Sequence, residues 1–378
     1  MSTPSATAVV VGAGIFGVCV ADALQAAGLE VTLLEAREPG HDHSSSGGHS
    51  RVIRCGHGDA RGDAYARSAR RAWALWQQLE QRLELSLLHP VGATWLATST
   101  DGPERSAFDR LRALGIPATW LEPEELDPRI RRDGLAGALH EVDAGVLRAG
   151  PAVAALAADL ARRGVRVRRA LATPDAAGRP VVDGEALDAD VVVWATGAWL
   201  GRQFPALALV TAARREYLYV EPPADWRPDA SVLVDVGAGV YVLPDVHGAG
   251  VKVADDLGER ELDLDAAERP PDPEVEARLR AYAAVRLPSL AAARRRGGRV
   301  CAYELTADDA FLAGRHPGAP HVWLVGGGSG HGFKHGPAFG ADVASWILTG
   351  AEPPPGFALG ARSGASATLR ASPPGGRC

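Results

Sequence analysis

The spacing of apolar and polar residues changes along the chain, and this periodicity predicts its main helices and strands. The stretch TAVVVGAG near the N-terminus is typical of a buried strand that runs into a glycine turn. The residues IFGVCVADALQAAG that follow have helical spacing and end at Gly28, and EVTLLEA is typical of a second buried strand. This order predicts a βαβ unit, whose parallel strands belong to a sheet covered on both faces.

Similar patterns recur at wide separation along the chain. Residues 64–84 have helical spacing, whereas the segments around 91–98 and 212–256 contain short alternating runs typical of an antiparallel sheet. The stretches ALDADVVVWATGAW (186–199) and HVWLVGGGSGHG (321–332) return to the buried-strand pattern. We therefore predict that the first sheet is assembled from three separated pieces of the chain.

A length of 378 residues also favours two interleaved domains over one simple core. We expect an α/β fold in which a Rossmann-like cofactor-binding domain is joined to an α+β substrate domain with a mixed, largely antiparallel sheet. The expected boundaries are 6–84, 146–210 and 306–350 for the cofactor-binding domain, 85–145 and 211–305 for the substrate domain, and 351–378 for a flexible tail rich in Pro, Gly, Ala and Ser.

Composition and charge narrow the class of protein. The net charge of −6 argues against a nucleic-acid partner and against a basic protein of the membrane surface. The four cysteines, Cys19, Cys55, Cys301 and Cys378, lie too far apart for a disulfide framework, so we expect a reducing, cytoplasmic location. The apolar N-terminal stretch is too short to span a bilayer and lacks the features of a signal peptide, so no membrane partner is expected.

A glycine pattern joins the first predicted strand to the first predicted helix. Gly12, Gly14 and Gly17 form G-x-G-x-x-G, and Glu35 ends the second strand 18 residues after the last of them. The three glycines permit a tight turn, close approach of the backbone to a pyrophosphate, and close packing of helix on strand. The helix N-terminus then faces the phosphates, and Glu35 accepts hydrogen bonds from the adenosine ribose. The pattern predicts a dinucleotide site.

The rest of the sequence favours FAD over a nicotinamide cofactor. No second complete G-x-G-x-x-G follows a strand, although transfer between flavin and a pyridine nucleotide usually needs another such site. The triplet ATG (195–197) and the late GGGSGHG place small residues at strand ends, where a long cofactor meets the backbone. We therefore expect one FAD.

The polar stretch from 37 to 63 lacks periodicity and is expected to be a long functional loop. Four histidines and a cysteine crowd it: His41, His43, His49, Cys55 and His57. A metal enzyme is therefore one alternative. Because their spacing matches no standard zinc motif, we expect no metal.

Six motifs occur in the order expected of one enzyme family: VVVGAGIFG, SRVIRCGHG, ATGAW, GVYVLPDVHGAGVKV, GRVCAYELTADDAFLAGRHP and GGGSGHGFKHG. Up to about residue 350 the chain resembles the monomeric sarcosine oxidase group, which includes N-methyltryptophan oxidase and belongs to the FAD amine oxidases of the D-amino acid oxidase class. The resemblance implies a monomer that oxidises the C–N bond of a secondary or cyclic amino acid with O₂, giving an imine and hydrogen peroxide. It also implies FAD attached covalently to Cys301, which by itself resembles an ordinary buried thiol.

The resemblance assigns roles in the substrate site as well. Arg54 and Lys334 correspond to the pair that binds the substrate carboxylate, which needs fixed cations away from bulk water. Lys252 corresponds to the lysine that activates oxygen, where a cation stabilises the developing negative charge. Arg51 matches a second arginine near the flavin, and Tyr241 matches a tyrosine of the substrate site.

Some positions depart from the family pattern. Sarcosine oxidases have a histidine four residues beyond the active-site lysine, where this chain has Asp256. The piperideine-carboxylate oxidase of the nikkomycin pathway has an aspartate there, so oxidation and aromatisation of a cyclic imino acid is an alternative function. His331, in contrast, follows the sarcosine oxidase pattern. The loop SSSGGHSR lacks the histidine pair that is usual in sarcosine oxidases and has Gly47 and His49 nearby instead.

A flavin-binding protein without turnover is the alternative of another class, and the set Arg54, Lys252 and Lys334 argues against it. We expect catalytic roles for Lys252, Arg51, Asp256 and Tyr241. We expect substrate contacts from Arg54, Lys334, Tyr241 and His331. We expect FAD contacts from Gly12, Gly14, Ile15, Phe16, Gly17, Glu35, Ala36, Ser50, Arg51, Ala195, Thr196, Gly197, Cys301, Gly330, Gly332, Phe333 and Lys334.

Overall fold

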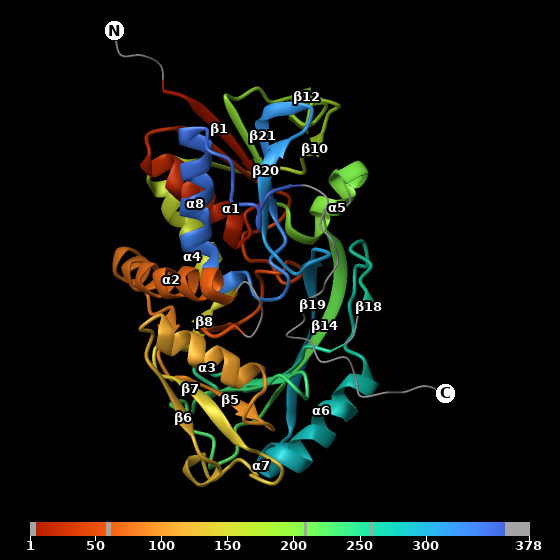
Figure 1. The fold of residues 1–378 in the computed structure, drawn as a ribbon. Helices are drawn as coiled ribbons and strands as arrows, with labels where there is room; N and C mark the ends of the chain where they lie inside the picture. Colours follow the sequence, from red (N-terminus) through yellow and green to blue (C-terminus); the bar gives the residue numbers. More distant parts are fainter. Residues whose placement is uncertain (1–4, 58–61, 208–209, 258–259, 360–378) are drawn as a thin grey trace.

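The computed structural model describes residues 5–57, 62–207, 210–257 and 260–359 and shows two sheets at opposite ends of the molecule (Figure 1). The upper sheet has six strands in the order β20-β21-β13-β1-β2-β9. Its strands are parallel except β20, which runs antiparallel to β21. Their bounds are β1 Thr7–Val11, β2 Glu30–Glu35, β9 Arg166–Arg169, β13 Val191–Trp194, β20 Leu312–His316 and β21 Ala319–Gly326.

Helices and a small sheet cover the two faces of the upper sheet. One face packs on α1 (Ile15–Ala26), α2 (Gly62–Leu83), α4 (Ala149–Arg162) and α8 (Gly336–Thr349). The small sheet lies over the opposite face and is formed by β10 Thr173–Pro174, β11 Pro180–Val182 and β12 Glu185–Ala186. The predicted βαβ unit and its covered sheet are confirmed. Gly28 follows α1 with a φ of +93°, a conformation that glycine adopts without strain.

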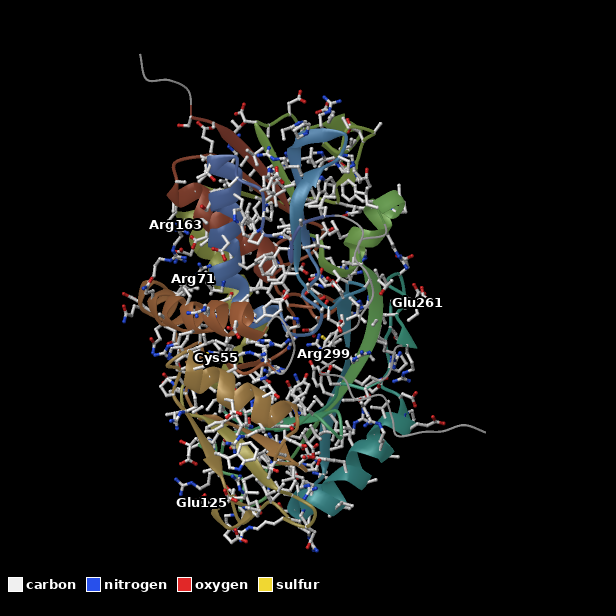
Figure 2. All side chains as sticks on the ribbon, viewed as in Figure 1. Cys55, Arg71, Glu125, Arg163, Glu261 and Arg299 are labelled. Carbon is white, nitrogen blue, oxygen red and sulfur yellow. The ribbon has the colours of Figure 1, made fainter. Side chains whose placement is uncertain are left out.

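The helices of this layer are also linked by charge. Arg163 follows α4 and pairs with Asp159 of the same helix at 2.9 Å and with Asp22 of α1 (Figure 2). Asp159 is buried, so its carboxylate needs these partners to offset lost hydration. The pair therefore ties the C-terminal end of α4 to α1.

The lower sheet has nine strands, in the order β18-β14-β17-β16-β15-β5-β7-β6, with β19 pairing on β14. It is antiparallel apart from the β15–β5 pair, as the alternating sequence patterns predicted. Its strands are β5 Ala93–Ala97, β6 Ala118–Leu121, β7 Gly137–Glu141, β14 Thr211–Val220, β15 Val232–Asp235, β16 Val240–Leu243, β17 Val251–Asp255, β18 Arg260–Glu261 and β19 Arg295–Leu305. Helices α3 (Pro103–Ala113), α6 (Pro273–Arg286) and α7 (Pro288–Ala291) pack beside it.

The strands of the upper sheet come from the three pieces of chain expected for the cofactor-binding domain, and those of the lower sheet from the two pieces expected for the substrate domain. The domain boundaries themselves remain our proposal. Long strands β14 and β19 pair along most of their length and run from the lower sheet toward the upper layer (Figure 1).

The prediction of an unstructured loop from 37 to 63 was wrong in part. Residues Ser50–Ile53 form β3, which pairs with β8 (Gly145–Arg148), and β8 pairs with β4 (Leu88–His89). The sequence did not predict this strand, because the run is short and polar residues surround it. Its partner strand also lies almost a hundred residues away in the chain. Helix α2 begins at Gly62, inside the predicted loop, and residues 58–61 lie outside the described part of the chain.

The predicted tail also needs correction where the structure describes it. The Phe357 ring packs near Phe339, Phe311 and Trp346, and its carbonyl accepts a hydrogen bond from the Ala313 amide at 2.7 Å. An aromatic side chain thus anchors residues up to 359 on the upper layer. Residues 360–378 of the predicted tail lie outside the described residues.

None of the helices within the described residues combines the length and the apolar character needed to cross a membrane.

The contact between α1 and α8 yields a prediction about stability. A Cβ at Gly340 would lie 2.6 Å from Cys19 Cβ and 2.7 Å from the Cys19 carbonyl carbon, so the helices must separate to admit it. We expect Gly340→Ala to lower the free energy of unfolding by about 1–3 kcal/mol, measured by urea denaturation. Gly297→Ala is the control, because its added methyl meets no atom within 4 Å. Equal stability of the two variants would show that α1 and α8 do not need this close contact.

Candidate functional site

Two hollows adjoin between the upper and the lower sheet. The larger has a volume of about 500 Å³ and the smaller about 140 Å³. They share five lining residues, Ile15, Phe16, Ser45, Ser46 and Glu304. They therefore form one path that starts beside the ends of β1 and β2 and reaches the lower sheet.

Most residues expected at the site line this path. The larger hollow is lined by Gly12, Gly14, Ile15, Phe16, Glu35, Ala36, Ala195, Thr196 and Gly197. The smaller hollow is lined by Ile15, Phe16, Arg51, Arg54, Tyr241, Asp256, Gly330, His331, Gly332, Phe333 and Lys334. Four of the expected residues line neither hollow: Gly17, Ser50, Lys252 and Cys301.

The glycine turn after β1 has the shape that a dinucleotide requires. Gly12 has a φ of +100°, and a Cβ there would lie 2.5 Å from the Ala195 carbonyl oxygen. A Cβ at Gly17 would lie 1.8 Å from the Gly12 carbonyl oxygen, so any side chain would push α1 away from the turn. The backbone thus stays bare along the wall of the larger hollow, which fits the pyrophosphate of FAD.

The acidic end of β2 and a serine loop complete this wall. Glu35 accepts the Ala13 amide at 2.8 Å through one carboxylate oxygen and the Arg37 amide at 3.0 Å through the other. Each oxygen retains a lone pair for a ribose hydroxyl. The Ile15 amide at the start of α1 donates to Ser46 Oγ at 3.0 Å, so a hydroxyl lies where a phosphate is expected. The donor set and the bare backbone fit FAD.

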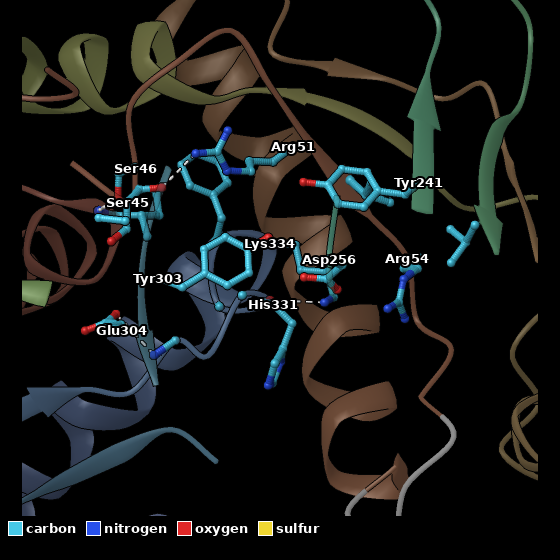
Figure 3. A pocket seen from close by; sticks show the side chains of 18 of the residues that line it. Ser45, Ser46, Arg51, Arg54, Tyr241, Asp256, Tyr303, Glu304, His331 and Lys334 are labelled. Atoms are coloured by element: carbon cyan, nitrogen blue, oxygen red, sulfur yellow. Dashed lines mark hydrogen bonds between the residues drawn. The ribbon is translucent and has the colours of Figure 1, made fainter. Parts of the chain in front are cut away.

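Arg54 is held at the smaller hollow by its neighbours in the lower layer (Figure 3). Its guanidinium lies 4.0 Å from the centre of the Trp95 ring and donates to the Gly56 carbonyl. The buried Glu141 accepts the indole N–H of Trp95 at 3.0 Å and two backbone amides of the segment that follows Arg54. Burial raises the pKa of Glu141, and the positive charge of Arg54 opposes that shift.

Lys334 reaches the same hollow from the opposite layer, in the 3₁₀ turn η4 (Phe333–His335). The lysine is buried, and its Nζ donates to the His331 carbonyl at 3.1 Å. Its own carbonyl accepts the indole N–H of Trp76 in α2 at 2.8 Å. The turn thus places an ammonium group inside the protein, opposite the guanidinium from the other layer (Figure 3).

Arg51 lines the smaller hollow, and Lys252 lies behind it. Lys252 on β17 is 1% exposed, and its Nζ lies 4.0 Å from the centre of the Tyr217 ring and 3.3 Å from the Ser50 carbonyl. Burial, and then the charge of Arg51, lower its pKa well below the usual range. Arg51 donates to the carbonyls of Ser50, Ser45 and Gly47 at 2.7–2.8 Å. Two cations thus lie together in a region lined by carbonyls and rings.

Cys301 on β19 lies behind the wall of the smaller hollow. Its sulfur is 3.6 Å from Arg51 Nη2, and the residues that follow it, Ala302 and Tyr303, line the hollow. The thiol is buried, with 8% of the residue exposed.

Asp256 lines the smaller hollow immediately after β17 and pairs with an arginine that the sequence analysis missed. Arg215 on β14 is 2% exposed, and its Nε lies 3.7 Å from Asp256 Oδ1. Its guanidinium carbon lies 5.4 Å from the centre of the Tyr303 ring. Arg215 stands between Arg214 and Glu216 in the sequence, so its burial could not be distinguished there from that of an ordinary surface charge.

Glu304 is a second residue that the sequence analysis missed, although an acid in the apolar run CAYEL was a signal. It lines both hollows, so it lies where they meet. Figure 3 shows its side chain among those of the smaller hollow. Oε1 accepts the Gly328 amide at 3.1 Å, and Oε2 has no hydrogen-bond partner among the described residues. Burial raises its pKa from an ordinary value of 4.5 to about 7.

The histidines of the 37–57 segment do not gather into one cluster. His41 lies 3.9 Å from Glu35, and burial lowers its pKa to about 4. His49 packs against Tyr219 instead. His57, at the end of the segment, lies apart from the other three histidines. Its ring centre is 5.5 Å from that of His331 and 5.8 Å from that of His335. Burial lowers the pKa of both His57 and His335 well below the usual range.

Comparison with known proteins identifies the family of this chain. Residues 7–346 match the family model described as FAD dependent oxidoreductase. The chain belongs to the FAD dependent oxidoreductase family. The resemblance and the fold expected from the sequence are confirmed.

Two proteins that are similar to this chain are named as oxidases. Monomeric sarcosine oxidase of Bacillus sp. (strain B-0618) is 27% identical over 90% of this chain and 92% of its own length. N-methyl-L-tryptophan oxidase of Escherichia coli (strain K12) is 28% identical over 89% of this chain and 94% of its own length. The chain is therefore an FAD-dependent oxidoreductase of the sarcosine oxidase and N-methyltryptophan oxidase type.

Solved structures share the fold. A modified fructosyl peptide oxidase from Aspergillus nidulans has a TM-score of 0.82 at 20% identity, with 98% of this chain and 97% of that chain covered. L-proline dehydrogenase from P. horikoshii has a TM-score of 0.80 at 21% identity, with 93% and 95% covered. At these identities the likeness concerns the architecture alone.

The carboxyl group of Glu304 yields a prediction about pH. Its pKa is raised in the folded protein, so the folded state binds the proton more tightly than the unfolded state. Stability is therefore lost as pH rises from about 4.5 to about 7, by up to about 3 kcal/mol. We expect Glu304→Gln to gain stability relative to the wild type between about pH 5 and about pH 8, measured by urea denaturation of the cofactor-free protein.

Glu185→Gln is the control for this prediction, since Glu185 is exposed. It should leave the pH dependence of stability unchanged. The same pH dependence in Glu304→Gln and in the wild type would show that Glu304 ionises normally in the folded protein.

Proposed function

We propose that this family member is an oxidase of a secondary or cyclic amino acid. It removes hydrogen from the C–N bond and transfers two electrons to O₂, so that an imine and hydrogen peroxide form. The observation that carries the proposal is the presence of Arg54 and Lys334 in one buried hollow that adjoins the cofactor path. FAD, when bound, supplies the two-electron chemistry, and the residues of the chain bind, orient and manage charge.

Arg54 and Lys334 would bind the substrate carboxylate. The guanidinium of Arg54 offers a planar fork of donors, and the ammonium of Lys334 adds a point charge from the opposite layer. Because the hollow is small and its cations are fixed by Trp95 and by the His331 carbonyl, a carboxylate there would hold the amine end in one orientation. Tyr241 lines the same hollow and would limit the size of the substrate side chain.

Lys252 would stabilise the negative charge that develops on O₂ as it is reduced. Its pKa lies well below that of an exposed lysine because it is buried, so Nζ releases its proton more readily. A proton or positive charge at this atom would stabilise negative charge that develops on oxygen. Arg51, fixed by three carbonyl groups, would keep a permanent positive charge beside it.

Cys301 would anchor FAD through a covalent bond. Its sulfur lies on the strand whose next two residues line the smaller hollow, and Arg51 Nη2 lies 3.6 Å away. The position supports the anchor, whereas a core thiol would need no cationic neighbour.

Asp256 favours a second candidate, the oxidation and aromatisation of a cyclic imino acid. The carboxylate lines the smaller hollow and lies 3.7 Å from the buried Arg215. An acid here would accept a ring N–H or a proton released from the ring. The number of oxidation rounds on one cyclic substrate would distinguish this candidate from simple amine oxidation.

The carboxylate site yields a test of the function. Without oxygen, the flavin absorbance of the purified protein should bleach on addition of N-methyl or cyclic amino acids, and oxygen should restore it with release of hydrogen peroxide. Arg54→Met and Lys334→Met should each raise the half-saturating substrate concentration by roughly 10- to 150-fold, because a charged hydrogen bond is lost. Analogues without a carboxylate should bind the wild type and these variants equally well.

Arg166→Met is the matched control, since Arg166 is an exposed arginine on β9. It should leave half-saturation unchanged. Bleaching by amines that lack a carboxylate, and by none that carry one, would refute the proposed substrate class.

The anchor yields a separate test. After acid precipitation or denaturing electrophoresis, the yellow flavin should stay with the wild-type polypeptide and should leave the Cys301→Ser variant. Cys55→Ala removes another buried cysteine and should retain the flavin. Complete release of flavin from the denatured wild type would rule out a covalent bond, although it would leave the oxidase activity open to the first test.

A further inference from the structure

Three imidazoles meet beside the smaller hollow, and we call them the imidazole cluster: His57, His331 and His335. One ring nitrogen from each lies within 4.8 Å of those of the other two. We propose that the imidazole cluster binds a single first-row transition-metal ion, with Zn²⁺ as the probe. Nothing in the family resemblance or in the names of the similar proteins concerns such a site.

The nitrogens of two of these rings need a partner that the protein does not supply. His57 is 1% exposed and His335 is 0% exposed, and Nε2 of each has no hydrogen-bond partner within the described part of the chain. Buried polar atoms are nearly always hydrogen-bonded, so two such nitrogens at one place indicate a missing ligand. A metal ion would accept both lone pairs at once.

The opposite nitrogens are held in the way that metal-binding histidines usually are. His335 Nδ1 lies 3.0 Å from Ser68 Oγ on α2, and His331 Nε2 donates to the Asp309 carbonyl at 3.0 Å. Such outer hydrogen bonds fix the ring and its tautomer and leave the other nitrogen to coordinate. In His331 the lone pair is then on Nδ1.

Aromatic rings enclose the cluster. The Tyr65 ring lies 5.1, 4.9 and 5.6 Å from those of His57, His331 and His335, and Phe311 lies 4.8 and 5.2 Å from the last two. This wall limits access of water that would compete for the nitrogens. A ligand set of three imidazoles suits zinc, copper, nickel or cobalt, whereas magnesium and calcium prefer oxygen.

Two charged groups face the cluster and oppose a cation. Lys334 lies between His331 and His335 in sequence, and Arg54 precedes His57 by three residues. Both repel positive charge at His57. The carboxylate proposed above to bind these cations would offset that repulsion, and this one point rests on the proposed function. A carboxylate ligand and the metal should therefore strengthen each other's binding.

The metal would be a positioning element rather than a redox centre. It would clamp the segment after β3, which carries Arg54, to the turn η4, which carries Lys334. The two carboxylate-binding cations would then keep a fixed spacing although they belong to different layers. Two hydrogen bonds join the same turn to α2: one links Trp76 to the Lys334 carbonyl, and the other links Ser68 to His335.

The experiment uses the full-length FAD-loaded protein without a histidine tag, stripped by a chelator and then dialysed against Zn²⁺. We expect one zinc per chain, retained through gel filtration. His57→Phe and His335→Phe should weaken zinc binding by more than the roughly 10- to 100-fold that loss of an outer hydrogen bond causes, and Ser68→Ala should weaken it within that range. His89→Phe removes a half-buried histidine from a different ring pair and should retain the zinc.

Bound Cu²⁺ gives a readout that does not depend on activity. Its electron paramagnetic resonance spectrum should show coupling to three ring nitrogens in the wild type and to two in His335→Phe. If His57→Phe and His335→Phe do not fold, the zinc affinity of Ser68→Ala and the wild-type Cu²⁺ spectrum still test whether the imidazole cluster binds the metal. Flavin absorbance in each sample shows that the protein is loaded, so a failure here is distinct from a failure of the oxidase proposal.

Two results would overturn the proposal. One is a folded, yellow wild-type protein that retains no zinc after dialysis, which would indicate a water molecule among three neutral imidazoles. The other is equal zinc retention by the wild type and by the variants of His57 and His335, which would place any metal elsewhere.

Discussion

Burial of several positive charges in one small region is the constraint on which the site depends. Arg51, Arg54, Lys252 and Lys334 lie within or beside the smaller hollow, where hydration is limited. Many of their contacts are backbone carbonyls and aromatic rings rather than carboxylates. Such partners reduce the desolvation penalty but leave the net charge in place. The region therefore favours anionic ligands and negative charge that develops during a reaction.

The architecture supplies these partners from two layers at once. Arg51 lies in β3, a short strand that pairs with β8, and Arg54 follows it directly. Lys252 comes from β17, and Lys334 from a turn that Trp76 ties to α2. No single element carries the site, so its geometry depends on how the two sheets pack.

The path for the cofactor depends on absent side chains as much as on present ones. Gly12 and Gly17 permit a turn that no residue with a Cβ allows, and this keeps the wall of the larger hollow open. Side chains of β19 alternate between the two sides of the strand. Cys301 and Tyr303 belong to one cluster of ring neighbours, whereas Glu304 points to the junction of the two hollows.

The sequence by itself determined the features that depend on neighbouring residues: the βαβ unit, the glycine turn with Glu35, the helix end at Gly28 and the order of the family motifs. Only the tertiary structure decided which distant groups meet. The pairing of β3 with β8, the contact of Arg215 with Asp256, and the meeting of His57 with His335 join residues far apart in the chain. Periodicity and spacing encode local geometry, whereas long-range contacts arise from the packing of whole layers. Glu304 shows the difference, because an acid in an apolar strand was visible in the sequence, but its raised pKa follows from burial between two hollows.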